Sequence, residues 1–155
     1  MKLQFHHFFV FAPPGAPQAD RLLEAGFREG PGNRHPGQGT ANRRFFFDNG
    51  MLEFLWVEDR DEAHGPDAAP TRLEERSRFR ETGFAPFGVA THGPLEGSVL
   101  IPPFPCWSYS PPYLQPDQEI WVADNAAHPG EPMLFYAGFF PPPGRPAAGP
   151  LDHPN

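Results

Sequence analysis

The chain of 155 residues has a single cysteine, Cys106, so no disulfide can form within it. This scarcity of cysteine favours a cytoplasmic location. Positive charge is also in short supply, because 12 Lys and Arg residues stand against 19 Asp and Glu residues. The resulting formal net charge of −7 and pI near 5.4 argue against nucleic acid or an anionic membrane as a partner.

Long hydrophobic runs are missing as well. No segment approaches the roughly 20 apolar residues that span a bilayer. The apolar opening, MKLQFHHFFVFAPPG, is short and contains two histidines, and no small-residue cleavage site follows it, so we expect no signal peptide. Against this background, 23 prolines and 16 glycines beside 16 phenylalanines indicate strands and turns with few helices in one domain.

The most informative stretch is residues 35–57, HPGQGTANRRFFFDNGMLEFLWV. It predicts a Gly-rich loop, strands at 42–47 and 51–57, and a tight turn at 48–50, because Asn-Gly is a strong hairpin signal. Both faces of the second strand are apolar, so we expect that strand to be central and covered on both sides. Glu53 is the exception. A carboxylate buried there requires a hydrogen-bonding, ionic or metal partner.

The remaining elements of the first half follow from periodicity. A strand at 3–11 carries His7 on one largely apolar face and His6 on the other. A helix at 16–25 should close at Gly26, and a brief strand near 27–29 should precede the loop at 30–41. Thr71 and Glu74 have capping-box spacing for a helix that continues to about residue 80. Its arginines, Arg72, Arg76 and Arg80, are expected to form a solvated face.

The second half predicts strands without a convincing helix. We expect them at 84–91, 99–101, 107–109, 119–123 and 133–139, separated by Pro-rich turns. The tail at 141–155 is rich in Pro and Gly and poor in apolar residues, so it is expected to be a loosely held terminus.

Purely structural roles account for several of these polar residues. His6 and His7 are suited to hydrogen-bonding the neighbouring backbone, and Glu53 to pairing with Arg43 or Arg44 across the hairpin. These two arginines face opposite ways, and the sequence does not decide which of them faces Glu53.

A functional role is the alternative. The loop and strand start place Gln38, Thr40, Asn42 and the two arginines at one end of an apolar sheet. Polar groups that converge on an aromatic concavity are typical of small-molecule sites.

Three motifs carry a resemblance to a known family. FHHFFV, with His7, and MLEFLWV, with Glu53, are similar to the opening strand and the fourth strand of the vicinal-oxygen-chelate superfamily of glyoxalases, extradiol dioxygenases and bleomycin-resistance proteins. HPGQGTANRRFFF resembles a glyoxalase-like subgroup of that superfamily.

This resemblance implies an α+β fold in which two βαβββ-type modules form a cupped, barrel-like mixed sheet, the second module lacking a clear helix. The modules would be residues 3–69 and 84–140 of a single domain, 1–140.

The resemblance also implies a site. The superfamily holds a divalent metal with a histidine and a glutamate from each module, which carries over to His7 and Glu53 as metal ligands for Zn, Ni, Fe or Mn. Glu53 is in addition the candidate catalytic residue. The candidate ligand-binding residues are His7, Gln38, Asn42, Arg43, Arg44 and Glu53.

The second module departs from this pattern. Pro86 or Phe87 stands where its histidine is expected, and Phe135 where its glutamate is expected. Other side chains with ligating atoms are His35, His64, His92 and Glu131, but no pattern places them in the cleft.

Three functional classes follow. The missing ligands favour a glyoxalase-like small-molecule-binding protein of the bleomycin-resistance type, with a degenerate metal site in an aromatic cleft. The alternative is a metal-dependent lyase, isomerase or dioxygenase acting on a small oxygen-rich substrate, with Glu53 as ligand or base. The third class is a structural or partner-binding protein. We expect a small, oxygen-rich or anionic ligand, a metal that is weakly bound or absent, and a homodimer.

Overall fold

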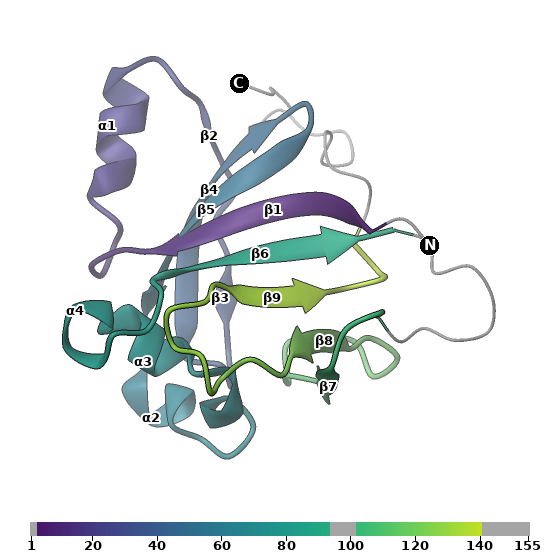
Figure 1. Cartoon of the computed structure of the whole chain (residues 1–155). Coiled ribbons are helices and arrows are strands. Elements are labelled where there is room, and N and C mark those ends of the chain that lie inside the picture. The colour runs from purple at the N-terminus through teal and green to yellow at the C-terminus, as the bar shows by residue number, and fades with distance from the viewer. Residues whose placement is uncertain (1–2, 94–101, 141–155) are drawn as a thin grey trace.

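A computed structural model of the chain describes residues 3–93 and 102–140. Within these ranges nine strands form a single mixed sheet. The strands are β1 (Gln4–Phe11), β2 (Glu29–Gly30), β3 (Arg34–His35), β4 (Thr40–Phe47), β5 (Gly50–Val57), β6 (Phe87–His92), β7 (Cys106–Tyr109), β8 (Ile120–Ala123) and β9 (Met133–Tyr136). Their order is β2-β4-β5-β1-β6-β9-β8-β7, with β3 against β4. The sheet curls without closing (Figure 1), which confirms the α+β, cupped-sheet prediction.

The two halves of the sheet repeat one arrangement. β1 runs parallel to β5, with His7 opposite Met51. In the same way β6 runs parallel to β9, with Gly88 opposite Met133. The antiparallel β1–β6 pair joins the halves at the centre of the sheet. No helix occurs in residues 84–93 or 102–140, in line with the expected lack of a helix in the second half.

The hairpin of the first half forms as predicted, but its turn is one residue shorter than the predicted 48–50. Phe47 pairs with Gly50, so the loop consists of Asp48 and Asn49, and Gly50 belongs to β5. Gly50 does not have a positive φ. Its lack of a side chain serves packing instead, since a Cβ there would lie 2.6 Å from Cε1 of Phe5.

The first helix, α1 (Gln18–Glu24), lies within the predicted range, and Gly26 follows it with a φ of 91°. The predicted continuous helix from Thr71 is wrong. The chain forms a 3-10 helix, η1 (Ala69–Thr71), and then α3 (Leu73–Ser77) and α4 (Phe79–Thr82). Arg72 interrupts the helix at a φ of 58°, and the hydroxyl of Thr71 donates to the carbonyl of Ala68.

The prediction that the arginines form a solvated face is also wrong for Arg76, which is only 2% exposed. Its Nη1 donates to the carbonyls of Ala85 and Glu131, each at 3.0 Å. Because the helix is broken at Arg72, its arginines do not share one face. Arg76 therefore ties α3 to the segments that lead into β6 and β9.

The preceding helix, α2 (Arg60–Ala63), is capped by the carboxylate of Asp59.

Most of the other predicted strands match, with β6 to β9 near their expected ranges. Residues 30–41 were expected as a loop, but they contain β3, which pairs with the start of β4. The strand predicted at 99–101 and the tail at 141–155 lie outside the described residues. No helix within the described ranges is long and apolar enough to cross a membrane.

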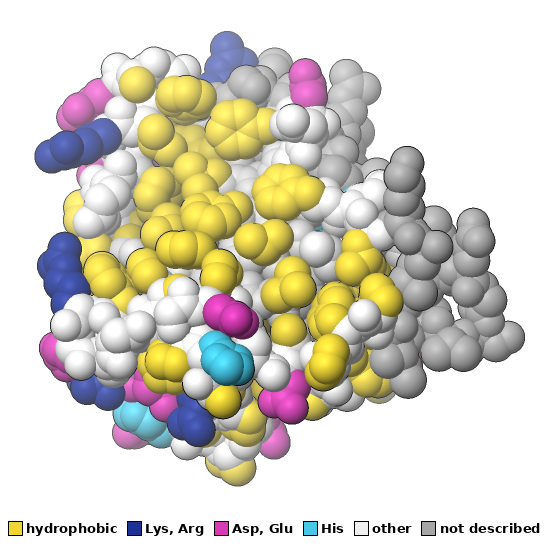
Figure 2. All heavy atoms as spheres, viewed as in Figure 1, with side chains coloured by type: hydrophobic (Ala, Val, Ile, Leu, Met, Phe, Trp, Pro, Cys, Tyr) yellow, Lys and Arg dark blue, Asp and Glu magenta, His cyan; other side chains and the backbone are white. Residues whose placement is uncertain are grey.

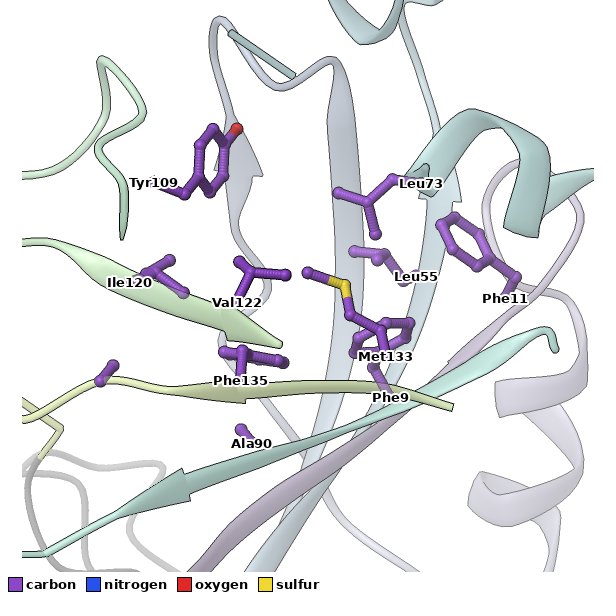
Figure 3. Close-up of a cluster of buried hydrophobic side chains, with 11 residues drawn as sticks. Phe9, Phe11, Leu55, Leu73, Ala90, Tyr109, Ile120, Val122, Met133 and Phe135 are labelled. Atoms are coloured by element: carbon purple, nitrogen blue, oxygen red, sulfur yellow. The ribbon is translucent and has the colours of Figure 1, made fainter. Parts of the chain in front are cut away.

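The core lies on the concave side of the sheet (Figure 3). It joins Phe9 and Leu55 of the first half to Val122, Met133 and Phe135 of the second. The convex side is apolar as well, and Figure 2 shows hydrophobic side chains gathered over β1, β6 and β9. β5 is central, as predicted, but its outward side chains are only half-buried rather than fully covered.

Candidate functional site

A cavity of about 620 Å³ lies on the concave side of the sheet. Its walls come from both halves, including β1, β4 and β5 on one side and β7, β8 and β9 on the other. Most of its lining is apolar and aromatic. The polar side chains that line it are His6, His7, Asn33, Arg34, His35, Gln38, Asn42, Arg44, Glu53, Tyr109 and Tyr113.

His7 and Glu53 face the same concavity, as the family resemblance and the alternation of the two strands together predict. His7 is 5% and Glu53 is 6% exposed, and His7 Nε2 lies 3.4 Å from Glu53 Oε2. The amide of Asn42 donates to Glu53 Oε1, and the backbone N–H of Asn33 donates to Asn42 Oδ1 at 2.6 Å. The buried carboxylate therefore has a partner at each oxygen.

These partners keep Glu53 ionised. Burial alone raises the pKa of a carboxyl group, but the interactions with His7, with a smaller contribution from the Asn42 amide, lower the pKa of Glu53 to about 2. At neutral pH Glu53 is thus a hydrogen-bond acceptor and a fixed negative charge.

His6 also reaches the cavity, contrary to the prediction from simple alternation. In the β1–β6 ladder Phe5 pairs with Thr91 and His7 pairs with Ala90, so His6 is the extra residue of a β-bulge. A bulge re-aims side chains, and here it brings His6 Nδ1 to 2.7 Å from His7 Nδ1. No local sequence signal indicates this, because the bulge depends on the register with β6.

Of the two hairpin arginines, Arg44 is the one that lines the cavity. Its Nε donates to the carbonyl of Pro31 at 2.6 Å, and its guanidinium lies 5.2 Å from the centre of the Phe46 ring. Partial burial lowers its pKa. No carboxylate of the described residues lies within ion-pair distance of Arg44, so the expected alternative of an arginine ion pair with Glu53 is wrong.

Arg43 faces the opposite side of the hairpin and is not among the residues that line the cavity. It bridges Glu29 at 2.7 Å and Asp20 at 2.8 Å. The hydrogen bonds that its guanidinium donates to the Glu29 carboxylate raise the pKa of Arg43. Because adjacent strand residues point to opposite faces, placing Arg44 in the cavity forces Arg43 out of it.

A second hydrogen-bonded chain crosses the cavity wall. Tyr113 OH donates to Gln38 Oε1 at 3.1 Å, and Gln38 Nε2 donates to Thr40 Oγ1 at 2.7 Å. Thr40 Oγ1 also lies 2.8 Å from His35 Nδ1. Burial lowers the pKa of His35. This chain links the loop after β7 to the start of β4, two ends of the curled sheet. The sequence placed Gln38 here but gave no signal for Tyr113.

The metal-ligand set of the resembling superfamily does not fit these residues. The repeated register places Gly88 at the position that corresponds to His7, which corrects the sequence assignment to Pro86 or Phe87. Phe135 stands at the position of Glu53, and its ring lies 5.6 Å from that of His7. Within residues 3–93 and 102–140 no group of three or more His, Cys, Asp or Glu side chains could hold a metal.

The other residues with ligating atoms do not complete the set. His64 lies 3.6 Å from Glu74, Glu131 accepts from Asn125, and neither lines the cavity. His92 is buried beside His6, with 5.4 Å between ring centres. Only His35 among them lines the cavity.

Comparison with known proteins identifies a family for most of the first half of the chain. Residues 5–94 match the model of a family described as "Glyoxalase-like domain". The crystal structure of a hypothetical protein from Staphylococcus aureus aligns at 14% identity and a TM-score of 0.47, over 88% of this chain and 59% of that one. This chain therefore spans less than two thirds of that protein's length. No protein of curated function matches the sequence.

Proposed function

The chain belongs to the glyoxalase-like domain family, within the vicinal-oxygen-chelate superfamily, and on that premise we propose that its cavity binds a small organic anion with an apolar body. In this function the site holds a ligand directly, and the metal site of the superfamily is degenerate. The ligand would enter the aromatic cavity between the two halves of the sheet.

The observation that carries the proposal is the environment of Arg44. A guanidinium lines an aromatic cavity, and its hydrogen-bond acceptors among the described residues are uncharged. Carboxylate and phosphate oxygens are the preferred partners of arginine, which can bind them through two parallel hydrogen bonds. An anionic group on the ligand would give Arg44 a directly bonded anionic partner, which the described residues do not provide.

The second-module positions support the same function. Gly88 and Phe135 supply no metal ligand, and Phe135 adds apolar surface to the cavity wall. Cavities that bind small molecules are mostly apolar and contain a few placed polar groups. Here those groups are Arg44, the His7–Glu53 pair, and the Gln38 chain.

Calorimetric titration with benzoate, and with benzyl alcohol as its uncharged counterpart, tests the proposal. We expect benzoate to bind more tightly, and Arg44→Met to weaken benzoate binding by about tenfold while leaving benzyl alcohol unaffected. Arg43→Met is the matched control. It removes the same charge from the neighbouring residue, so it should lower the melting temperature and leave benzoate affinity unchanged. Equal benzoate affinities in the wild type and Arg44→Met would contradict the proposal.

A second candidate function, proton-transfer catalysis, is favoured by the chain from Glu53 through His7 to His6. A carboxylate that holds one imidazole against a second fixes ring orientation, as general bases require. Deuterium uptake into the methyl group of 4-acetylbenzoate, followed by proton NMR, tests it. A proton would pass from the methyl carbon to the imidazole of His6, leaving an enolate that takes a deuteron from solvent, and the imidazolium would release its proton to solvent. Exchange at the buffer rate would rule this candidate out.

The metal-dependent alternative has its own measurement. Elemental analysis of protein purified without chelator should find well below one metal ion per chain. A stoichiometric metal, lost in Glu53→Gln together with a measurable turnover, would instead support a metal-dependent lyase, isomerase or dioxygenase.

We also propose a cytoplasmic location, a single domain over residues 1–140, and a homodimer. Sedimentation analysis tests whether the protein is a dimer.

A further inference from the structure

Tyr109 is distinguished by a hydroxyl that has no hydrogen-bond partner among the described residues. The residue lies in β7, is 4% exposed, and lines the cavity. Its hydroxyl oxygen is fully buried and makes no hydrogen bond with any described residue. In Figure 3 the hydroxyl points away from Ile120 and Val122, the apolar neighbours at the base of its ring.

The other two tyrosines of the chain show what a buried hydroxyl normally does here. Tyr136 OH donates to the carbonyl of Gly93 at 2.7 Å, and Tyr113 OH donates to Gln38 Oε1 at 3.1 Å. Burying a hydroxyl without a partner loses its hydrogen bonds to water, and such groups are rare in folded proteins. Because Tyr109 lines the cavity, a ligand bound there can supply the missing acceptor.

The chemistry of that partner follows from the protonation of Tyr109. Burial, with a smaller contribution from Asp67, raises the pKa of its phenol well above the ordinary value. The hydroxyl is therefore protonated at neutral pH, and a protonated phenol in an apolar wall needs an acceptor. An uncharged oxygen suits it, because a second anionic group would have to be desolvated without a cation to pair with.

We propose that Tyr109 forms a second ligand subsite, at which its hydroxyl donates a hydrogen bond to an uncharged acceptor oxygen of the ligand. This inference rests on the proposed anion site at Arg44. Arg44 lies on β4 and Tyr109 on β7, close to opposite ends of the strand order, and both line the one cavity. The ligand class is thus an organic anion whose apolar body carries a ketone or a similar acceptor away from its charge.

A double-mutant cycle between protein and probe tests the subsite. The probes are 4-acetylbenzoate and 4-isopropylbenzoate, which have similar shapes and the same carboxylate, but only the first carries an acceptor. Tyr109→Phe should weaken 4-acetylbenzoate binding by roughly five- to tenfold and leave 4-isopropylbenzoate binding unchanged. In the ligand-free protein, Tyr109→Phe should leave the melting temperature unchanged or raise it, because it removes a hydroxyl without a partner.

Tyr136→Phe is the matched control, since it removes a hydroxyl that is bonded within the protein and lies outside the cavity lining. It should lower the melting temperature and leave both affinities unchanged. If Tyr109→Phe changes the two affinities equally or not at all, or lowers the melting temperature of the free protein, the subsite is wrong. Arg44-dependent benzoate binding would then still support the proposed function. If neither probe binds the wild type, both proposals fail.

Discussion

Arg44 and Glu53 lie directly opposite one another in the β4–β5 ladder, yet no ion pair joins them. The carboxylate of Glu53 is held by His7 and Asn42, and the guanidinium of Arg44 donates to the carbonyl of Pro31. Two opposite charges on one cavity wall therefore have separate partners. This separation allows each to be substituted without stripping the other of its hydrogen bonds.

The ionisation of Glu53 should stabilise the fold in a defined pH window. Its pKa in the folded protein is about 2, below the ordinary value of 4.5. A depressed pKa contributes stability that is present above about pH 4.5 and is lost as the pH falls towards 2. Urea unfolding between pH 7 and pH 2.5 should show the wild type losing roughly 2–3 kcal/mol more than Glu53→Gln does.

Glu24→Gln is the control for this measurement, because Glu24 is exposed on α1. It should follow the wild-type curve. Parallel pH dependence in the wild type and Glu53→Gln would mean that the carboxylate is not stabilised in the folded protein.

Asn42 should help to set this pKa. Its amide donates to Glu53 Oε1, so Asn42→Leu removes a hydrogen bond to the charged form and should raise the pKa of Glu53. Carbon-13 NMR of the Glu53 carboxyl group in a selectively labelled sample measures the change. Arg44→Met should raise this pKa less, because Arg44 makes no hydrogen bond to Glu53. A larger shift in Arg44→Met than in Asn42→Leu would contradict this order.

Gly88 should tolerate no side chain. An added Cβ would lie 2.4 Å from Cε1 of Phe9 and 2.8 Å from the carbonyl oxygen of Met133. Gly88→Ala should therefore reduce the free energy of unfolding by about 1–3 kcal/mol, measured by urea denaturation. Gly130→Ala is the matched control, since nothing lies within 4 Å of its added Cβ. Equal stabilities of the two variants would show that the β1–β6 contact is looser than described.

Arg76 should act as a structural clamp. Arg76→Met leaves the buried carbonyl of Ala85 and the carbonyl of Glu131 without their shared donor, which should cost about 1–3 kcal/mol of unfolding free energy. Arg80 is exposed on the adjacent helix, so Arg80→Met should change stability by about 0.5 kcal/mol or less. Chemical denaturation of both variants distinguishes the two arginines. Similar losses of unfolding free energy in both variants would mean that Arg76 is solvated, as the sequence predicted.

The sequence was sufficient for the features that depend on local pattern. An apolar run broken by a central glutamate predicted β5, and Asn-Gly predicted the hairpin. Alternation, together with the family resemblance, placed His7 and Glu53 on inward faces. These signals are local because side-chain direction in a regular strand is fixed by the two-residue period of the backbone. The FHHFFV and MLEFLWV motifs indicated the family because they too are local strand patterns.

The tertiary structure alone decided the features that depend on register or on contacts between distant segments. The bulge that turns His6 inward, the outward orientation of Arg43, and the placement of Gly88 opposite Met133 all follow from which strand pairs with which. The burial of Arg76 depends on acceptors up to 55 residues away along the chain. No local pattern encodes such contacts, because the cost of burying a polar group is decided by the partners that the complete fold brings to it.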